Sequence, residues 1–384
     1  MNAKIKGKQI CESSHLPYLD NIRWTVVAMV LLFHVFWFYS ITFTPQPKWI
    51  ANSQPQDIVV MLFNPWFMSL LFVVSGICAY LYLQHHSDKE FFKARSLKLL
   101  VPSTLGLILY HWISGVFNMK YICHRFGLSD FTLGMSAREF LPLLLEESIN
   151  ILWFLVDLYV FSLILIGLRR IYKDNLNAFF EKHRCHGIVI FCCSLVLLYL
   201  VGLIDIPNYI DILITLRPLY YLTAFLLGYY VFSVQSVMRV ISNDRWIFAS
   251  ISLIIILCMI FTGCWKVTVK PEIISSVPYI LYGWTMVLAC LGLYCTYFNY
   301  SNAITRYMSR NSFGLYIVHY AIITSFGYWL AVHSSLPQWA IYTLLIAIVF
   351  VLTPIIYQLL YCVPFVRFCL FGKTSQQPIN ILNH

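Results

Sequence analysis

Ten apolar runs, separated by short polar segments, fill most of this chain of 384 residues. Each run is close to the roughly 20 residues that a helix needs to cross a bilayer core. We expect the runs to be helical, because a chain in lipid must satisfy its own backbone hydrogen bonds. The predicted spans are residues 22–40, 57–83, 97–117, 150–168, 186–204, 216–236, 246–264, 278–298, 312–333 and 337–361.

The scarcity of charge supports the same fold. The chain is 60% hydrophobic and only 11% charged, whereas a soluble domain carries roughly 25% charged residues. Most of its surface must therefore face lipid, and we predict an all-α, polytopic integral membrane protein with about ten transmembrane helices. No linker divides it, so we assign residues 1–18 to an N-terminal tail, 19–365 to one transmembrane domain and 366–384 to a C-terminal tail.

The positions of the basic residues predict the orientation. With the N-terminus in the cytoplasm, the inner segments hold 18 Lys and Arg residues and the outer segments hold 7. Such a bias is typical of cytoplasmic loops and favours both termini inside. It also accounts for the net charge of +10 without a nucleic-acid partner. The predicted partner of the surface is the lipid bilayer.

The first span carries three polar residues that are costly in lipid and therefore indicate function. Asp20 precedes Arg23 by three residues, so the two can pair where the helix begins. His34 follows Arg23 by eleven residues, which is three turns plus about 20°, and lies about 16 Å further along the axis. The three residues share one stripe and suggest a polar track. A packing histidine with an interfacial arginine is the alternative.

Four other residues are candidates for the same reason. His319 follows Ser312 by seven residues on one helix face. His111 lies between Tyr110 and Trp112, which favours a structural role at the membrane interface. Asp157 needs a cationic partner or a cluster of donors, and Arg217 is one such partner. For each of these residues a purely structural hydrogen bond or ion pair stays open.

The sequence gives no sign of a metal or a bound cofactor. Its twelve cysteines are scattered, without a pair or a Cys/His cluster at the spacing of a zinc site. It contains no phosphate-binding loop of the GxxxxGK type, no GxGxxG and no HExxH. We therefore expect no metal and no resident cofactor.

Several segments, in order, resemble the membrane acyltransferase-3 family, and in particular its periplasmic-glucan branch. The family opens with LD-x-x-R followed by a histidine and closes with S-x-G-L-Y-x-x-H, and its paired arginines appear here as Arg95 and Lys98. The matching segments are LPYLDNIRWTVVAMVLLFHV (16–35), LLFVVSGICAYLYL (70–83), FFKARSLKLLVPS (91–103), INILWFLVDLYVF (149–161), RPLYYLTAFLLGYYVF (217–232) and SRNSFGLYIVHYAI (309–322).

The resemblance implies an enzyme that moves an acyl group from cytosolic acyl-CoA to a hydroxyl of an extracytoplasmic carbohydrate. It also implies a place in the bacterial cytoplasmic membrane. His34 would be the base or form an acyl-imidazole. Arg23 would orient the site or bind the donor, and Asp20 would orient Arg23. A separate extracytoplasmic partner for the acyl group is also conceivable.

The remaining roles follow from the same resemblance. Arg95 and Lys98 would hold the CoA phosphates, since arginine binds phosphate with two hydrogen bonds, and His319 would help to hold the donor. On the outer side Trp153, Asp157 and Arg217 would contact the acceptor. The sequence does not identify the acyl group, and both acetyl and succinyl fit.

Two other classes of function remain. A proton-coupled transporter or flippase would use the buried histidines as a relay, and it predicts broken helices at matching positions of two halves. A non-catalytic sensor or scaffold would have no need of the polar stripe in the first span.

Overall fold

The computed structural model describes residues 16–39, 55–126, 141–142, 144–145, 148–149, 152–172, 175–182, 186–204, 217–262 and 276–374. Within these ranges the chain is helical and has no strand, as the sequence predicts. Most of the predicted N-terminal tail and the last ten residues, 375–384, lie outside the described residues.

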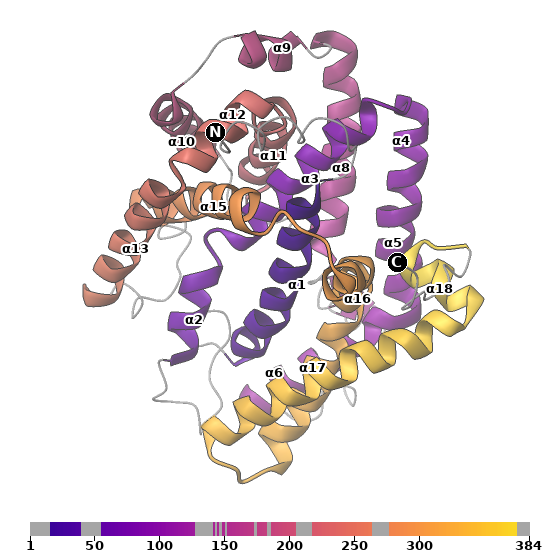
Figure 1. The fold of residues 1–384 in the computed structure, drawn as a ribbon. Helices are drawn as coiled ribbons and strands as arrows, with labels where there is room; N and C mark the ends of the chain where they lie inside the picture. The colour runs from indigo at the N-terminus through magenta and orange to yellow at the C-terminus, as the bar shows by residue number, and fades with distance from the viewer. Residues whose placement is uncertain are drawn as a thin grey trace.

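Figure 1 shows the helices, which are numbered in chain order. The first half of the chain contains α1 (Pro17–Phe38), α2 (Pro55–Phe63), α3 (Phe67–Leu83), α4 (Asp88–Arg95), the π-helical η1 (Ser96–Leu100), α5 (Val101–Gly106), the π-helical η2 (Leu107–His111), α6 (Trp112–Phe126), α8 (Trp153–Tyr172) and α9 (Asn175–Lys182). The second half contains α10 (Gly187–Ile204), α11 (Pro218–Leu227), the π-helical η3 (Gly228–Phe232), α12 (Gln235–Asn243), α13 (Arg245–Phe261), α15 (Val277–Tyr297), α16 (Ala303–His333), α17 (Gln338–Cys362) and α18 (Pro364–Phe371).

Each of the ten predicted segments overlaps at least one helix of the structure, and the segment 57–83 is divided by a turn into α2 and α3. Within the described residues, seven helical segments are long and apolar enough to cross a membrane. The number is eight if the segment Pro218–Phe232, formed by α11 and η3, and α12 (Gln235–Asn243), bent by 102°, belong to one span. Two predicted spans fall outside this number, because α13 has only 17 residues and α8 carries Asp157, Arg169 and Arg170. The protein is thus a multi-pass membrane protein, while the number ten and the orientation stay predictions.

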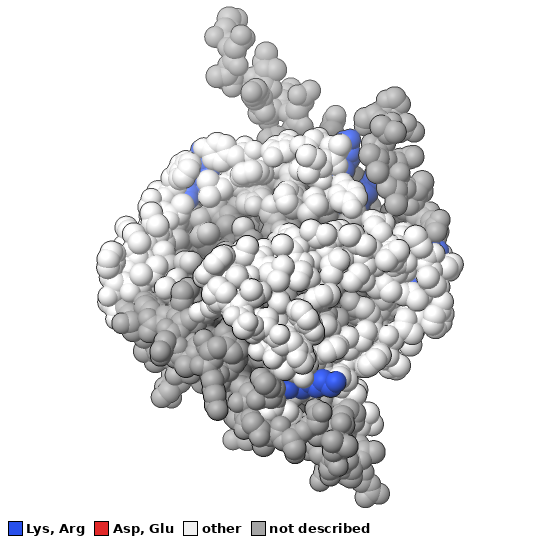
Figure 2. Space-filling view, turned by 90° about the horizontal axis from the view of Figure 1, so that it is seen from below, with Lys and Arg blue, Asp and Glu red and all other residues white. Residues whose placement is uncertain are grey.

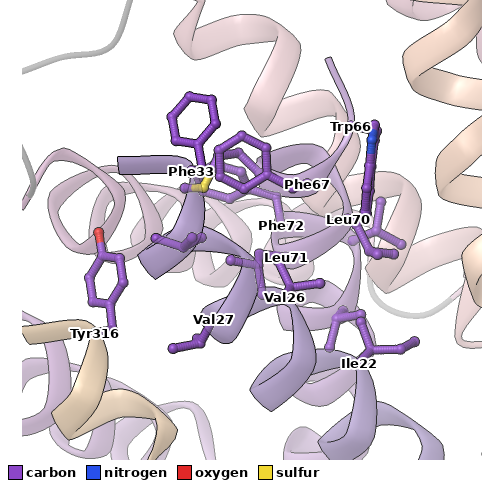
Figure 3. Close-up of a cluster of buried hydrophobic side chains, with 14 of the residues drawn as sticks. Ile22, Val26, Val27, Phe33, Trp66, Phe67, Leu70, Leu71, Phe72 and Tyr316 are labelled. Carbon is purple, nitrogen blue, oxygen red and sulfur yellow. The ribbon is translucent and has the colours of Figure 1, made fainter. Parts of the chain in front are cut away.

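Helix α1 lies in the middle of the bundle, between α3 and α16 (Figure 1). Its apolar face is buried, and Ile22 and Val30 are fully inaccessible. Figure 3 shows this face against α3, with Phe33 beside Phe67 and Tyr316 of α16 on the other side. The ring centroids of Phe33 and Phe67 are 4.8 Å apart. This packing fixes which side of α1 points away from lipid.

The beginning of α1 is tied to the segment that leads into α16. Pro17 begins the helix, where its missing N–H costs nothing. The Asn21 amide donates to the carbonyls of Phe298 and Tyr300 at 2.6 and 2.9 Å. These bonds join positions 277 and 279 residues apart in the sequence. They set the height of α1 against α16.

Two glycines let α3 approach the α11–η3 junction. A Cβ at Gly76 would clash with the carbonyl of Phe225, and a Cβ at Gly228 would clash with the carbonyl of Val73. Small residues at a helix crossing allow such backbone contact, which replaces the hydrophobic drive that lipid does not supply. Gly76, in the segment LLFVVSGICAYLYL (70–83), therefore serves the packing of α3.

Residues 88–126 form one long helical segment, which starts earlier than the predicted span 97–117. The Ser87 hydroxyl and the Glu90 carboxylate form a capping box at its start. Two π-helical turns interrupt it, and each changes the face that the following residues present. The predicted C-terminal tail, residues 366–384, begins inside α18. This helix packs against α5.

The surface is consistent with a lipid environment. Figure 2 shows a broad face whose described residues are almost all uncharged, with Lys and Arg at its rim. Large apolar side chains are exposed on the outer helices, among them Ile108, Leu197 and Leu253. In water such a surface would cause aggregation.

Candidate active site

His34 of α1 and His319 of α16 meet in the interior of the bundle. His319 Nε2 lies 3.4 Å from His34 Nδ1, and the ring centroids are 5.2 Å apart. His319 is fully buried, whereas His34 stays partly accessible. The packing of α1 on α16 thus joins two histidines that the sequence separates by 285 positions.

Hydrogen bonds to the backbone fix the tautomer of each neutral ring. His34 Nδ1 donates to the carbonyl of Val30 at 2.8 Å, and His319 Nδ1 donates to that of Tyr316 at 2.6 Å. Because a carbonyl only accepts, both Nδ1 atoms carry the proton. His319 Nε2 then accepts a share of the His34 proton. His34 Nε2 keeps its lone pair for a reacting group, as a general base requires.

Three further side chains near this histidine pair are Tyr320, Asn118 and His111, and the sequence indicated only His111, for a structural role. Tyr320 presents its ring edge-on to His34 at 5.3 Å, and its hydroxyl accepts from Asn118 at 3.4 Å. His111 is fully buried and interacts electrostatically with His319. Neither ring nitrogen of His111 has a hydrogen-bond partner among the described residues. His111 thus lies inside the bundle, and its place at the membrane interface stays a prediction.

Asp20 and Arg23 form the ion pair that their spacing predicts. Arg23 Nη1 lies 3.1 Å from Asp20 Oδ1, and both side chains are partly exposed. The pair lies on α1 about 16 Å from His34, as eleven helical residues require. The stripe on α1 therefore has a charged, partly exposed end at Asp20 and Arg23, and its opposite end lies at the histidine pair.

Arg95 and Lys98 lie near this open end. Both interact electrostatically with Arg23, although they belong to α4 and η1. The Arg95 guanidinium stacks over the Phe91 ring at 4.9 Å, and the Lys98 ammonium lies 5.8 Å from the Phe313 ring. Three cations from separate parts of the sequence thus lie near one another, which suits a polyanionic ligand. We call the cluster of Arg23, Arg95 and Lys98 the cationic mouth.

The three predicted acceptor-side residues belong to α8 and the start of α11. Asp157 is buried, and the Arg217 guanidinium lies 4.2 Å from the Tyr220 ring. Trp153 packs on Tyr221, with ring centroids 5.5 Å apart. The direct pairing of Asp157 with Arg217 stays a prediction.

Aromatic contacts connect this region to the histidine pair. Phe154 of α8 meets Tyr316 at 6.0 Å between ring centroids. The carbonyl of Tyr316 is the acceptor for His319 Nδ1. Phe154 of α8 therefore contacts the residue whose carbonyl accepts the His319 proton.

The described residues contain no group of three or more His, Cys, Asp or Glu that could hold a metal ion. In the histidine pair, the Nδ1 atom of each ring already donates its proton to a backbone carbonyl. The arrangement can support proton transfer to a neutral imidazole, because His34 Nε2 keeps its lone pair.

Comparison with known families agrees with the geometry. The family model described as acyltransferase domain matches residues 16–358, which include the histidine pair, the ion pair and the cationic mouth. The chain therefore belongs to the acyltransferase-3 family and is an enzyme of the transferase class.

Curated relatives point to one branch of this family. Glucans biosynthesis protein C of Escherichia coli (strain K12) is 22% identical over 374 residues, covering 93% of this chain and 94% of the relative. The protein of the same name from Escherichia coli O81 (strain ED1a) is equally similar over the same length. No solved structure matches the chain.

Proposed function

We propose that this membrane acyltransferase moves an acyl group from cytosolic acyl-CoA to a hydroxyl of an extracytoplasmic glucan. The observation that carries the proposal is the histidine pair, which leaves one imidazole lone pair on a partly accessible residue deep in the bundle. The name of the curated relatives supports a glucan as the acceptor. The enzyme acts in the bacterial cytoplasmic membrane.

We propose a direct transfer, in which His34 acts as the base. His34 Nε2 takes the proton of the acceptor hydroxyl while its oxygen attacks the thioester carbonyl carbon. The carbon–sulfur bond breaks, and the CoA sulfur takes the proton back from the imidazolium. The carbonyl of Val30 holds the ring in place throughout, because Nδ1 donates to it at 2.8 Å. The reaction consumes no net proton.

The cationic mouth would hold the other end of the donor. Arg23, Arg95 and Lys98 interact with one another there, and phosphate oxygens would replace their mutual repulsion by attraction. The stripe on α1 would guide the pantetheine arm toward His34. Trp153, Asp157 and Arg217 would contact the glucan from the outer side, and acetyl and succinyl both remain candidates for the acyl group.

Transport finds less support. It predicts broken helices at matching positions of two halves. Among the described residues a single helix pair is sharply bent, Pro218–Phe232 with Gln235–Asn243, and no second one matches it.

Mass spectrometry of extracytoplasmic glycans tests the proposal. A deletion strain is complemented with the wild type, with His34→Ala or with His86→Ala, an exposed control histidine. We expect the acetyl or succinyl ester mass with the wild type and the control, and a loss of about 10²–10⁴-fold with His34→Ala, the usual contribution of a general base.

Protein amount decides how the result is read. All three proteins are quantified in the membrane fraction, and His34→Gln serves as a second variant if the alanine variant is depleted. Identical glycan spectra for wild type and deletion strain, with the protein present, would overturn the proposed function and favour transport.

A further inference from the structure

A fourth cation joins the mouth from the far end of the chain. Lys98 interacts electrostatically with Lys373 as well as with Arg23 and Arg95. Lys373 is 275 residues away from Lys98 in the sequence, and no family motif quoted above includes it. Within the described part of the chain, Arg95, Lys98 and Lys373 take part in no ion pair.

The backbone places Lys373 there by a close contact. Gly372 caps α18 in the left-handed conformation at φ 63°, and its N–H donates to the carbonyl of Phe368 at 2.9 Å. A Cβ at Gly372 would clash with the carbonyl of Leu97, which precedes Lys98. Only glycine meets both conditions without strain. Lys373 is therefore held directly beside η1.

The rest of α18 is anchored just as firmly. Leu370 is fully buried, and its side chain packs near Gly106 of α5. Arg367 is buried as well and donates to the carbonyl of Tyr361 at 3.3 Å. The position of Lys373 is thus a property of the fold rather than of a loose end.

The ammonium of Lys373 lies in surroundings that favour an anion. It lies 5.3 Å from the centroid of the Tyr361 ring and is only partly exposed. This partial burial lowers the pKa of the Lys373 ammonium, because the charged form loses hydration. Four like charges at one mouth repel one another, and a polyanion would relieve that repulsion.

We propose that Lys373 binds the phosphate groups of the donor, so that α18 completes the CoA site together with Arg95 and Lys98. The inference rests on the proposed function, in which acyl-CoA is the donor. CoA carries its phosphates at one end and its sulfur at the other, which matches a cationic mouth far from the histidine pair.

Binding of CoA to the purified full-length protein in lipid nanodiscs tests this assignment without an acceptor. Calorimetry compares the wild type, Lys373→Ala and Lys373→Arg with Lys89→Ala, which removes an exposed lysine of α4. We expect Lys373→Ala to raise the Kd for CoA by roughly 10-fold, as expected for one hydrogen bond to a charged group. Lys373→Arg and Lys89→Ala should stay within about twofold of the wild type.

Pantetheine, which lacks phosphates, is the second probe. Its Kd should be the same for the wild type and Lys373→Ala. Gly372→Ala keeps the charge but strains the cap, and it should weaken CoA binding in the same direction as Lys373→Ala.

Each result decides one of the two hypotheses. If the wild type binds CoA and Lys373→Ala binds it as tightly as Lys89→Ala, the role of Lys373 is overturned and the proposed function stands. The same holds if Lys373→Ala weakens pantetheine and CoA equally. If the wild type does not bind CoA, the donor assignment itself fails, and this inference falls with it.

Discussion

At the residue scale, the backbone carbonyls of Val30 and Tyr316 determine what the two histidines can do. Each accepts an Nδ1 proton from a histidine on its own helix, three or four residues away. A carbonyl that accepts in this way also fixes the orientation of the ring. The lone pair of His34 therefore points away from its own helix backbone, toward any group that enters the stripe.

His319 supports His34 rather than reacting itself, because its Nε2 faces the partner ring at 3.4 Å. Replacing it by alanine removes that acceptor, and we expect the rate of ester formation at saturating donor to fall by about 10- to 100-fold, as for groups that orient a reacting or ligating residue. The apparent KM for the donor should rise only if His319 also helps to hold the donor, as the family resemblance implies.

Two further variants make this assignment specific. His319→Gln keeps an acceptor near the position of Nε2 and should recover part of the lost rate. His333→Ala removes an exposed histidine at the end of the same helix and should have no effect. A His319→Ala enzyme with wild-type turnover would show that His34 does not need this neighbour.

At the element scale, the crossing of α3 with α11 and η3 depends on backbone contact. An alanine at Gly76 must push the carbonyl of Phe225 away, which costs about 1–3 kcal/mol as overpacking. Gly167 of α8 provides a matched control, because a Cβ there meets nothing within 4 Å. Gly167→Ala should be neutral or stabilising by up to about 1 kcal/mol, since alanine favours a helix.

Thermal unfolding of the purified protein in detergent measures both effects. We expect Gly76→Ala to lower the Tm by several degrees, whereas Gly167→Ala should keep or raise it. Equal Tm values for the two variants would mean that α3 and η3 can separate without loss, and the crossing would then not be a packing device.

The positions of the helices could be predicted from the sequence better than their ends. Each of the ten apolar runs overlaps a helix of the structure, because length and hydrophobicity are properties of each segment alone. Helix α16 nevertheless begins at Ala303 and not at 312, since Arg306 and Arg310 hide its first turns from a hydropathy reading. The capping box of Asn302 and Thr305 is the signal that marks the real start.

The candidate site divides along the same line. The pairing of Asp20 with Arg23 follows from a spacing of three residues on one helix, and the structure confirms it. The contact of His34 with His319 and the approach of Lys373 to Lys98 depend on the packing of distant helices. No local pattern encodes them, and the π-helical turns that place Lys98 and His111 have no sequence signal comparable to a cap.

At the scale of the whole molecule, the mouth formed by Arg23, Arg95, Lys98 and Lys373 must face the cytosol if CoA enters there. The basic residues predict this orientation by 18 to 7, with both termini inside. Because Lys373 lies eleven residues before the C-terminus, the side on which the C-terminus emerges also reports the side of the mouth. A measurement of the membrane topology therefore also tests the position of the donor site.

Reporter fusions answer it. We expect alkaline phosphatase fused after residue 384 to be inactive and a fluorescent protein at the same place to fluoresce, because the C-terminus stays in the cytosol. Phosphatase inserted within residues 263–275, a predicted outer segment with Lys266 and Lys270, should be active and serves as the control. An active phosphatase at residue 384 would put all four cations on the outer face, where cytosolic CoA cannot reach them. The mouth would then have to bind an extracytoplasmic anion, and the donor would have to approach His34 from the opposite end of α1.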